Sequence, residues 1–184
     1  MTELLNIRLR RARASDAERM VQWRDQESSK RFQASPPRTV EQLRETVRQQ
    51  EDALLTPQSV GRFYWIGELN RVPVVQVQIA VDERDRTQDS ATLGYMVDDR
   101  YQGRGVATTA VRAILPIVFD PGGLAIERLE AVAAVGNVAS KRVLEKAGFQ
   151  FEGIQRGLLV IRSERIDHAC YAMLNTDTSA GASQ

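Results

Sequence analysis

The spacing of apolar side chains predicts a series of strands and helices. Apolar residues at every second position are typical of half-buried strands, whereas apolar residues three and four positions apart are typical of amphipathic helices. By these patterns, with turn-forming residues at their ends, strands are predicted at 7–13, 62–69, 72–81, 90–97, 128–135, 149–157 and 166–174. Helices are predicted from about positions 15 and 39, from the turn near 105 to 119, and from 137 to 147. The chain contains no internal repeat.

Capping residues predict where the first two helices begin. Ser15 is followed three positions later by Glu18, and Thr39 is followed in the same way by Gln42. Both pairs fit the capping-box pattern, in which the two side chains bond each other's backbone N–H groups. The second of these helices is expected to continue through about Ala53.

The remaining segments are predicted to be loops. Residues 28–37 are polar and end in two prolines, and residues 82–89 form a charged connection. Asn70 and Arg71 are expected to make a tight turn between two strands. The chain then reads as one α+β domain, residues 1–175, with a disordered tail at 176–184 that is poor in apolar residues.

Composition narrows the class of protein. The 184 residues are 42% apolar and 27% charged, which is ordinary for a soluble globular domain. A net charge of +1 gives no reason to expect nucleic acid or a membrane as a partner. One cysteine, Cys170, cannot form an intramolecular disulfide, and one histidine cannot assemble a metal-ligand cluster, so no metal is expected. No apolar segment resembles a signal peptide or a membrane span, so a cytoplasmic location is expected.

A glycine-rich turn between a strand and a helix is the strongest chemical signal. Gly103 and Gly105 lack side chains, so backbone N–H groups can close around an anion at the positive end of the following helix. Arg104 adds a forked cation suited to phosphate oxygens. This arrangement predicts a phosphate-binding turn.

Two common phosphate motifs fit this turn poorly. A Walker P-loop requires Gly-Lys-Ser/Thr at its end, and that sequence does not occur here. A dinucleotide fingerprint would place a small residue where Thr108 stands, and it belongs to a parallel strand–helix–strand unit rather than behind antiparallel strands.

A third register, Gln102-x-x-Gly105-x-Ala107, resembles the acetyl-CoA-binding motif of the GNAT superfamily of N-acetyltransferases. The likeness continues through Leu93-Gly94-Tyr95, Asn137-Val138-Ala139-Ser140, Leu144-Glu145-Lys146-Ala147-Gly148-Phe149 and Phe151-Glu152-Gly153. These spacings are similar to the ribosomal-protein alanine acetyltransferase (RimJ/RimL) branch, over roughly Arg8 to Leu174. The resemblance implies the GNAT fold, a mixed α/β arrangement in which about four helices flank a mostly antiparallel twisted sheet of about seven strands, splayed at the acetyl-CoA site.

The resemblance also implies acetyl-CoA as cosubstrate and a set of residues that bind it. Backbone groups around Met96 and Val97 would pair with the pantetheine arm. Amides of the glycine turn would hold the pyrophosphate, with the Thr108 hydroxyl in reach. Asn137 would bond the pantetheine arm, although capping a helix is its ordinary alternative role. The implied cofactor-binding residues are Met96, Val97, Gln102, Gly103, Arg104, Gly105, Val106, Ala107, Thr108 and Asn137.

The implied chemistry is direct attack of a neutral amine on the thioester in a ternary complex. Ser140 resembles the hydroxyl that protonates the departing sulfur. The family pattern often has a tyrosine four residues later for that task, but Leu144 occupies the position here. A small packing residue near the helix start is the alternative reading of Ser140.

The sequence does not identify the general base. The family often has a glutamate in the first turn of the helix, where this chain has Thr109. Glu68, Asp98, Tyr95 and His168 are all conceivable, directly or through water. A lone histidine in an alternating strand more often has a structural role.

The acceptor is also open. Expected acceptors are a protein N-terminus or a small-molecule amine, bound between the 28–37 loop and the last strand pair, by a monomer or a homodimer. Acyl groups other than acetyl are not excluded. An alternative function from another class is a catalytically silent acyl-CoA-binding sensor or interaction module, because the family's glutamate and tyrosine are both missing.

Overall fold

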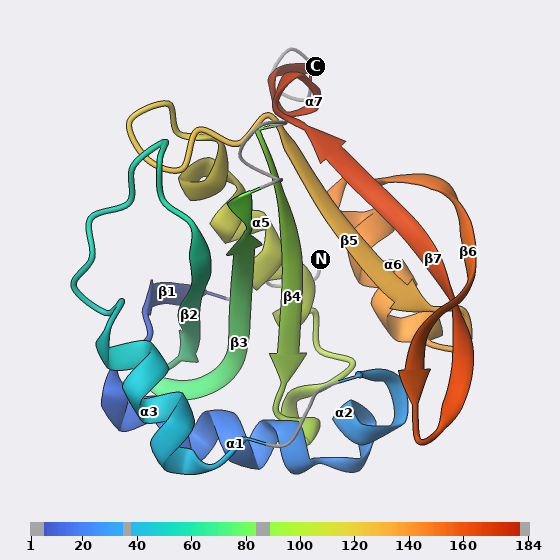
Figure 1. The fold of residues 1–184 in the computed structure, drawn as a ribbon, viewed down its shortest axis with the longest axis horizontal. Helices are drawn as coiled ribbons and strands as arrows, with labels where there is room; N and C mark the ends of the chain where they lie inside the picture. The colour runs from blue at the N-terminus through green and yellow to red at the C-terminus, as the bar shows by residue number, and fades with distance from the viewer. Residues whose placement is uncertain (1–5, 35–37, 84–88, 181–184) are drawn as a thin grey trace.

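The computed structural model describes residues 6–34, 38–83 and 89–180, which form a single seven-stranded sheet with helices packed on it (Figure 1). The strands are β1 (Ile7–Arg11), β2 (Gly61–Leu69), β3 (Val72–Val81), β4 (Ser90–Val97), β5 (Arg128–Ala134), β6 (Gln150–Ile161) and β7 (Glu164–Leu174). The helices are α1 (Ala17–Asp25), α2 (Glu27–Phe32), α3 (Val40–Arg48), α5 (Val106–Phe119), α6 (Val138–Ala147) and α7 (Asn175–Ala180), with 3-10 turns η1 (Ala14–Asp16) and η2 (Asp99–Tyr101). The strand order is β1-β2-β3-β4-β5-β7-β6, and only the β4–β5 pair is parallel. The predicted mixed, mostly antiparallel architecture is confirmed.

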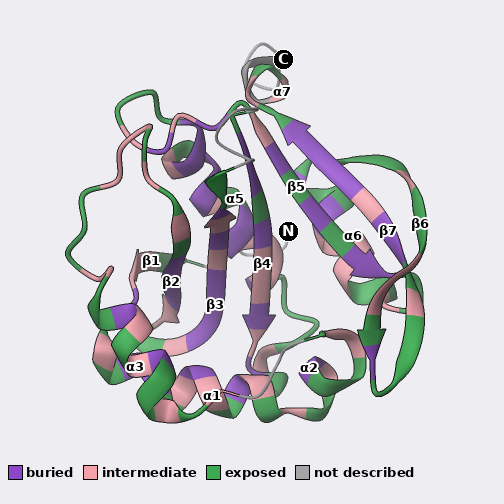
Figure 2. Ribbon diagram, viewed as in Figure 1, coloured by how far each residue is buried: buried purple, intermediate pink, exposed green. Residues whose placement is uncertain are grey.

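Helices cover both faces of the sheet. Within β2, Phe63 and Trp65 join one apolar core with residues of α5 and α6, whereas Tyr64 and Ile66 join a second core with residues of α1 and α3. Figure 1 shows α5 and α6 behind the sheet and α1 to α3 along its lower end. The two sides are called the α5–α6 face and the α1–α3 face below. Because β2 and β3 are covered on both faces, their middle residues are buried almost without interruption (Figure 2).

The sheet opens between β4 and β5. A short parallel ladder joins residues 90–92 to residues 128–130. Beyond it, β4 stays paired with β3 and β5 stays paired with β7, so the carboxyl ends of β4 and β5 diverge (Figure 1). The splay implied by the sequence resemblance is therefore present, and residues 93–97 of β4 form an edge inside the sheet.

Helix α5 begins directly after the glycine turn. Gly105 is its N-cap residue, with φ 82°, and Gly103 has φ 71°. Because this left-handed conformation is costly for residues with a side chain, the chain requires glycine at both positions. The sheet-facing side of α5 is apolar and includes the buried residues Val106, Ala110, Val111, Ile114 and Val118.

The first two helices differ from their sequence prediction. Ser15 is not an N-cap, because it lies inside η1 and α1 begins at Ala17. The carboxylate of Asp16 takes over the turn instead, accepting from the backbone N–H of Arg13 at 2.8 Å and from the Arg10 guanidinium at 2.7 Å.

The capping box at Thr39 is confirmed. Its hydroxyl oxygen accepts from the backbone N–H of Gln42 at 3.1 Å, and the Gln42 amide oxygen accepts in return at 2.9 Å. The helix ends at Arg48, however, and does not reach Ala53.

The segment 28–37 is not simply a loop, since α2 occupies residues 27–32. Its polar sequence has no apolar periodicity, and contacts with distant parts of the chain hold it in place. The Glu27 carboxylate accepts from the Arg162 guanidinium at 2.8 Å, for example. The two prolines at 36 and 37 lie outside the described residues.

The predicted strands are found in order, and the last pair is longer than predicted. β6 and β7 extend to Ile161 and Glu164 around a turn. Residues 175–180 form α7 where the sequence predicts disorder, while 84–88 and 181–184 lie outside the described residues. Across the described ranges, no helix combines the length and apolar content needed to cross a membrane.

Candidate active site

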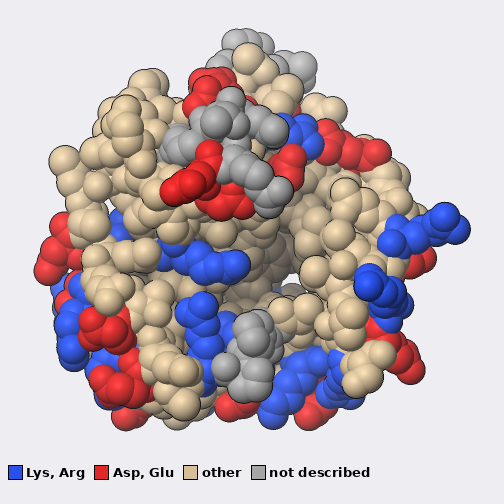
Figure 3. Space-filling view, viewed as in Figure 1, with Lys and Arg blue, Asp and Glu red and all other residues tan. Residues whose placement is uncertain are grey.

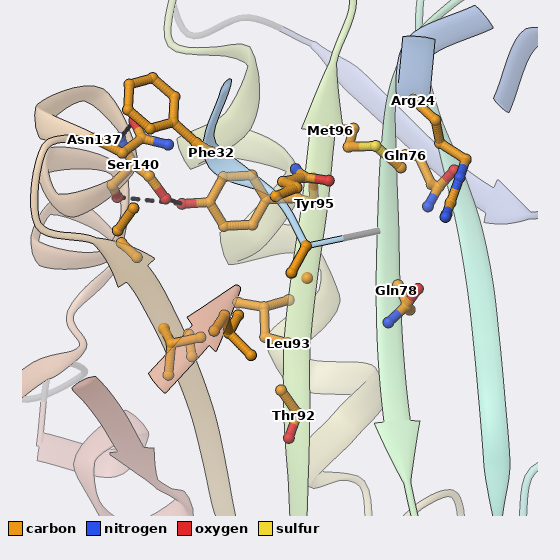
Figure 4. Close-up of a pocket in the computed structure, with 18 of the residues that line it drawn as sticks. Arg24, Phe32, Gln76, Gln78, Thr92, Leu93, Tyr95, Met96, Asn137 and Ser140 are labelled. Atoms are coloured by element: carbon orange, nitrogen blue, oxygen red, sulfur yellow. Dashed lines mark hydrogen bonds between the residues drawn. The ribbon is translucent and has the colours of Figure 1, made fainter. Parts of the chain in front are cut away.

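A pocket of about 290 Å³ lies where β4 and β5 diverge (Figure 4). Its lining comes from the end of α1, from α2, from β2 to β5, from the start of α6 and from the β6–β7 pair. The space-filling view shows a hollow in this part of the α1–α3 face, with Lys and Arg side chains along its border (Figure 3). The splay thus produces a cavity that gathers residues from most of the chain.

The strand register shows that the pocket joins the two faces of the sheet. Side chains directly opposite each other in a ladder point to the same face. Gln76 lies opposite both Ile66 and Met96, so these residues share the α1–α3 face. Tyr95 lies opposite Val77, in the adjacent pair of the same ladder, and therefore belongs to the α5–α6 face. Two ligands could meet in the gap after entering from opposite sides.

The edge of β4 that faces the gap is covered by the side chains of Gln26 and Gln33, which flank α2. The backbone N–H of Asp98 donates to β3, and by alternation the N–H and C=O groups of Tyr95 and Val97 point into the gap. The Gln33 amide donates to the Tyr95 carbonyl and the Gln26 amide donates to the Val97 carbonyl, both at 3.2 Å. The same alternation turns the backbone of Met96 toward β3, while its side chain lines the pocket.

Two hydroxyl groups meet on the far wall of the pocket. The Tyr95 hydroxyl lies 2.7 Å from the Ser140 Oγ and also contacts the Ser140 carbonyl at 3.2 Å (Figure 4). Because a carbonyl only accepts, a phenol that donates to it leaves the serine hydroxyl to donate to the phenol oxygen. Burial raises the pKa of Tyr95 to about 12, and its hydrogen bond with Ser140 only partly opposes this, so the phenol stays protonated at neutral pH.

The same wall contains the amino-terminal end of α6. Asn137 is the N-cap, and its side-chain oxygen accepts from the backbone N–H of Ser140 at 3.1 Å. The predicted capping role of Asn137 is confirmed, and both residues line the pocket. The positive end of a helix favours negative charge nearby, so this wall suits a group that becomes anionic.

The glycine turn lies beyond the pocket, at the start of α5. Residues 102–105 are exposed, no side chain caps the helix, and its first turn contains no acidic residue. The Gln102 amide donates to the Asp99 carboxylate at 2.6 Å, which orders the turn, and the Arg104 guanidinium lies 5.6 Å from the centre of the Tyr101 ring. The backbone amides that follow, including those of Val106, Ala107 and Thr108, begin the helix. This geometry can accept a phosphate group.

Two of the four candidate bases are engaged elsewhere. Glu68 is paired with Arg10 at 2.7 Å on the β1–β2 side of the sheet. Asp98 accepts from the Arg100 guanidinium at 2.7 Å and from the Trp23 indole at 3.2 Å. The Arg100 contact holds the pKa of Asp98 well below its usual range, and burial only partly opposes this. Neither carboxylate lines the pocket.

His168 does line the pocket, from β7. It lies opposite Ala134, alternates with the core residue Ala169, and so belongs to the α1–α3 face. Its Nδ1 is 2.8 Å from the Ile166 carbonyl. Since the carbonyl only accepts, Nδ1 carries the proton of the neutral ring and Nε2 is left as an acceptor. Asp167 and Tyr171, on the other face, bond the backbone N–H of residue 157 and the Glu145 carboxylate.

Several polar residues that line the pocket or cover the neighbouring β4 edge are not identified by sequence reasoning. Gln26 and Gln33 flank α2, a helix whose sequence has no apolar periodicity. Gln76 and Gln78 did leave a signal, because an apolar strand that reads Val-Val-Gln-Val-Gln-Ile contains two polar residues without an obvious purpose. Arg24, Arg38 and Arg62 also line the pocket, and nothing in their local sequence distinguishes them from surface arginines.

Comparison with known proteins adds family information to this geometry. The acetyltransferase (GNAT) domain family matches residues 6–150. The probable N-acetyltransferase YjcK of Bacillus subtilis (strain 168) is 41% identical over 88 residues, 48% of this chain and 48% of YjcK. The chain therefore spans about half the length of that relative. The uncharacterized N-acetyltransferase p20 of Bacillus licheniformis is 26% identical over 172 residues, 93% of this chain and 94% of p20.

Solved structures share the fold. RimL, a ribosomal L7/L12 alpha-N-protein acetyltransferase crystallised with coenzyme A, superposes with a TM-score of 0.76 at 20% identity, covering 95% of this chain and 96% of RimL.

Proposed function

Because the chain belongs to the GNAT acetyltransferase family, we propose that it transfers an acetyl group from acetyl-CoA to a primary amine in a ternary complex. The observation that carries the proposal is the pocket at the splay, which is lined by side chains from both faces of the sheet and has paired hydroxyls at the start of a helix. The likeness to RimL, which was solved with coenzyme A, supports the choice of cosubstrate.

The cosubstrate would enter from the α5–α6 face. The glycine turn, residues 102–105 with the first amides of α5, would hold the pyrophosphate, with Arg104 and Thr108 beside it. The backbone of Val97 would pair with the pantetheine arm, together with that of Tyr95 rather than of Met96, because of the alternation along β4. Asn137 would contact the arm from α6.

The two hydroxyls would assist the departing sulfur. As the amine nitrogen bonds the carbonyl carbon, the carbon–sulfur bond breaks and negative charge collects on sulfur. Ser140 would turn its hydroxyl from the phenol oxygen toward that sulfur and donate its proton, the Tyr95 phenol at 2.7 Å would turn from the Ser140 carbonyl and donate to the serine oxygen, and solvent would return a proton to the phenol. Tyr95 thus supplies the phenol that the family pattern places at position 144, where this chain has a buried leucine.

The amine would enter from the α1–α3 face and lose its proton there. With Glu68 and Asp98 paired elsewhere, His168 is the candidate that lines the pocket on that face with an accepting nitrogen. The accepting ring nitrogen can take a proton from an ammonium group directly or through water.

Thiol release tests the function directly. Purified protein is incubated with acetyl-CoA and a panel of amines, including small molecules and peptides with free N-termini, and coenzyme A binding is measured in parallel by calorimetry. Amine-dependent thiol release supports the transferase. Tight coenzyme A binding without release on any amine would favour the catalytically silent acyl-CoA sensor instead.

A further inference from the structure

We propose that the α1–α3 side of the pocket is an anion subsite, so that the preferred acceptor is a small amine that also carries a carboxylate or phosphate group. This inference rests on the proposed function and specifies its second substrate. It comes from the charge and hydrogen-bonding groups that line one end of the pocket.

Three arginines from separate segments line this part of the pocket. Arg24 lies in the last turn of α1, Arg38 immediately before the Thr39 cap of α3, and Arg62 at the start of β2. Among the described residues, the pocket lining contains no Asp or Glu. The local field is therefore positive, although the whole chain is nearly neutral.

The three cations influence one another. Burial lowers the pKa of Arg24, and the positive charges of Arg38 and Arg62 lower it further, against smaller opposing contributions from Tyr64 and Asp25. Like charges held around one volume raise the free energy of the ligand-free protein, and an anion in that volume would relieve the repulsion. Arginine side chains also present paired N–H donors that match carboxylate and phosphate oxygens.

A buried acceptor atom lies among these donors. The Gln76 side chain is 2% exposed, and its Oε1 has no hydrogen-bond partner. Figure 4 shows Arg24 and Gln76 at one end of the pocket and the Tyr95–Ser140 pair at the other. An unpaired buried oxygen is costly, and an N–H donor of the ligand would satisfy it. The subsite thus offers donors to an anionic group and an acceptor to the amine.

The alternatives fit less well. A polyamine would bring positive charge to a pocket lined by arginines. The phosphates of acetyl-CoA have their own site at the glycine turn, which does not line this pocket. In Figure 3 acidic side chains lie above the hollow and around the margins of this face, whereas Lys and Arg side chains border the hollow itself. Arg38 and Arg62 consequently face a part of the pocket that only the acceptor would occupy.

Matched acceptors test the charge requirement. Glycine is compared with glycinamide for the carboxylate source, phosphoethanolamine with ethanolamine for the phosphate source, and spermidine serves as the cationic probe. We expect the anionic member of at least one pair to be preferred by roughly 10- to 100-fold in kcat/KM, the usual effect of a hydrogen bond to a charged group. Equal rates within both pairs, or a preference for spermidine, would overturn the subsite.

Substitutions of the pocket arginines test whether these residues cause the preference for anionic acceptors. Arg38→Gln and Arg62→Gln, singly and together, are expected to raise KM for the anionic acceptor roughly tenfold or more, to remove the preference within each pair, and to leave KM for acetyl-CoA unchanged. Arg62→Lys should restore part of the affinity. Arg8→Gln on β1, an exposed arginine outside the pocket, is the control and should change none of these values. A double variant that keeps the preference, or loses acetyl-CoA affinity instead, contradicts the proposal.

Calorimetry on the coenzyme A complex separates this proposal from the transferase itself. Arginine-dependent binding of glycine or phosphoethanolamine without any acetyl transfer would keep the subsite and reject the transferase. Rapid transfer to neutral amines that does not depend on the arginines would keep the transferase and reject the subsite. If neither anionic amine binds, the subsite is rejected.

Discussion

At the scale of single residues, the hydroxyl pair gives Ser140 a clearer role than its sequence position does. A serine that merely packed near a helix start would not need a buried phenol at 2.7 Å. The pair joins two residues 45 positions apart, from β4 and α6. The family pattern indicates Ser140 as a candidate general acid. Nothing in the sequence indicates that Tyr95 lies beside it.

Ser140→Ala is predicted to lower kcat more than it raises KM for acetyl-CoA, because a group that assists the leaving sulfur acts mainly in the transition state. General acid assistance is typically worth ~10²–10⁴-fold. Steady-state kinetics on the best acceptor measures the effect. Asn137→Ala is the comparison, since it should chiefly weaken coenzyme A binding. A wild-type kcat in Ser140→Ala would make the serine a packing residue.

Tyr95→Phe is predicted to lower kcat as well, and its effect should not add to that of Ser140→Ala. Residues that act as one unit give double variants little worse than the worse single variant. Rates of the two single variants and the double variant complete the cycle. Additive losses in the logarithm of kcat would mean that the two hydroxyls act independently.

At the scale of elements, the junction between β4 and α5 contains the proposed phosphate site. Asp98 directly follows β4 and contacts α1 through Trp23 and η2 through Arg100. The glycine turn follows immediately. Sequence patterns predicted the position of this junction to within one residue. An alternating strand, two glycines and an apolar helix in succession are compatible with few other structures. The links made by Asp98 could not be predicted, since Trp23 lies 75 positions away.

Asp98→Asn is predicted to destabilise the fold at neutral pH by about 1–3 kcal/mol, the cost of weakening a buried charged hydrogen bond. For a chain of this size, that corresponds to a Tm lower by about 2–10 °C. Because the folded pKa of Asp98 is depressed, its contribution is present above the ordinary aspartate range near pH ~4 and is lost as pH falls below it.

Thermal melts of both proteins between neutral and acid pH should therefore converge as the pH falls. Glu41→Gln, which removes an exposed partner of Arg44, should change Tm little at any pH. A constant gap between wild type and Asp98→Asn would show that ionisation of Asp98 is irrelevant to stability.

Gly105→Glu is predicted to abolish coenzyme A binding. The residue is the N-cap of α5 with φ 82°, so a side chain adds strain, and a carboxylate would repel a phosphate at the helix end. Calorimetry with circular dichroism distinguishes lost binding from lost folding. Gly105→Ala is the matched variant, since it carries the strain without the charge and should bind more tightly than Gly105→Glu. Retained affinity in a folded Gly105→Glu protein would place the phosphate site elsewhere.

At the scale of the whole molecule, the order of strands and helices followed from apolar spacing, while the pocket did not. The pocket depends on α2, whose polar sequence gave no helical signal, and on arginines that local sequence does not distinguish. Ser15 illustrates the same limit, since the capping-box pattern indicated Ser15, whereas in the structure Asp16 accepts from the Arg10 guanidinium and the Arg13 backbone N–H. Periodicity reports which faces are buried, but not which side chains meet across the sheet.

Acetyl-CoA and coenzyme A are predicted to stabilise the whole fold more than NAD or ATP do. Ligand at a hundred times its Kd adds about 2.7 kcal/mol, which raises Tm by about 5–10 °C in a protein of this size. A thermal-shift series at equal ligand concentrations measures this. Equal shifts with NAD would contradict the assignment of the glycine turn to coenzyme A.

The side chains of Gln26 and Gln33, which cover the β4 edge, affect how much binding free energy a ligand can gain by pairing with that edge. The carbonyls of Tyr95 and Val97 already accept from Gln33 and Gln26 before any ligand arrives. An incoming amide would replace a bond that exists rather than make one that was missing, so the net enthalpy per bond is small. The side chains of Gln26 and Gln33 therefore compete with the ligand for these two carbonyl groups. Selectivity for coenzyme A then rests on the pyrophosphate and on the fit between the strands, while the unliganded sheet keeps an edge that cannot easily recruit a stray peptide.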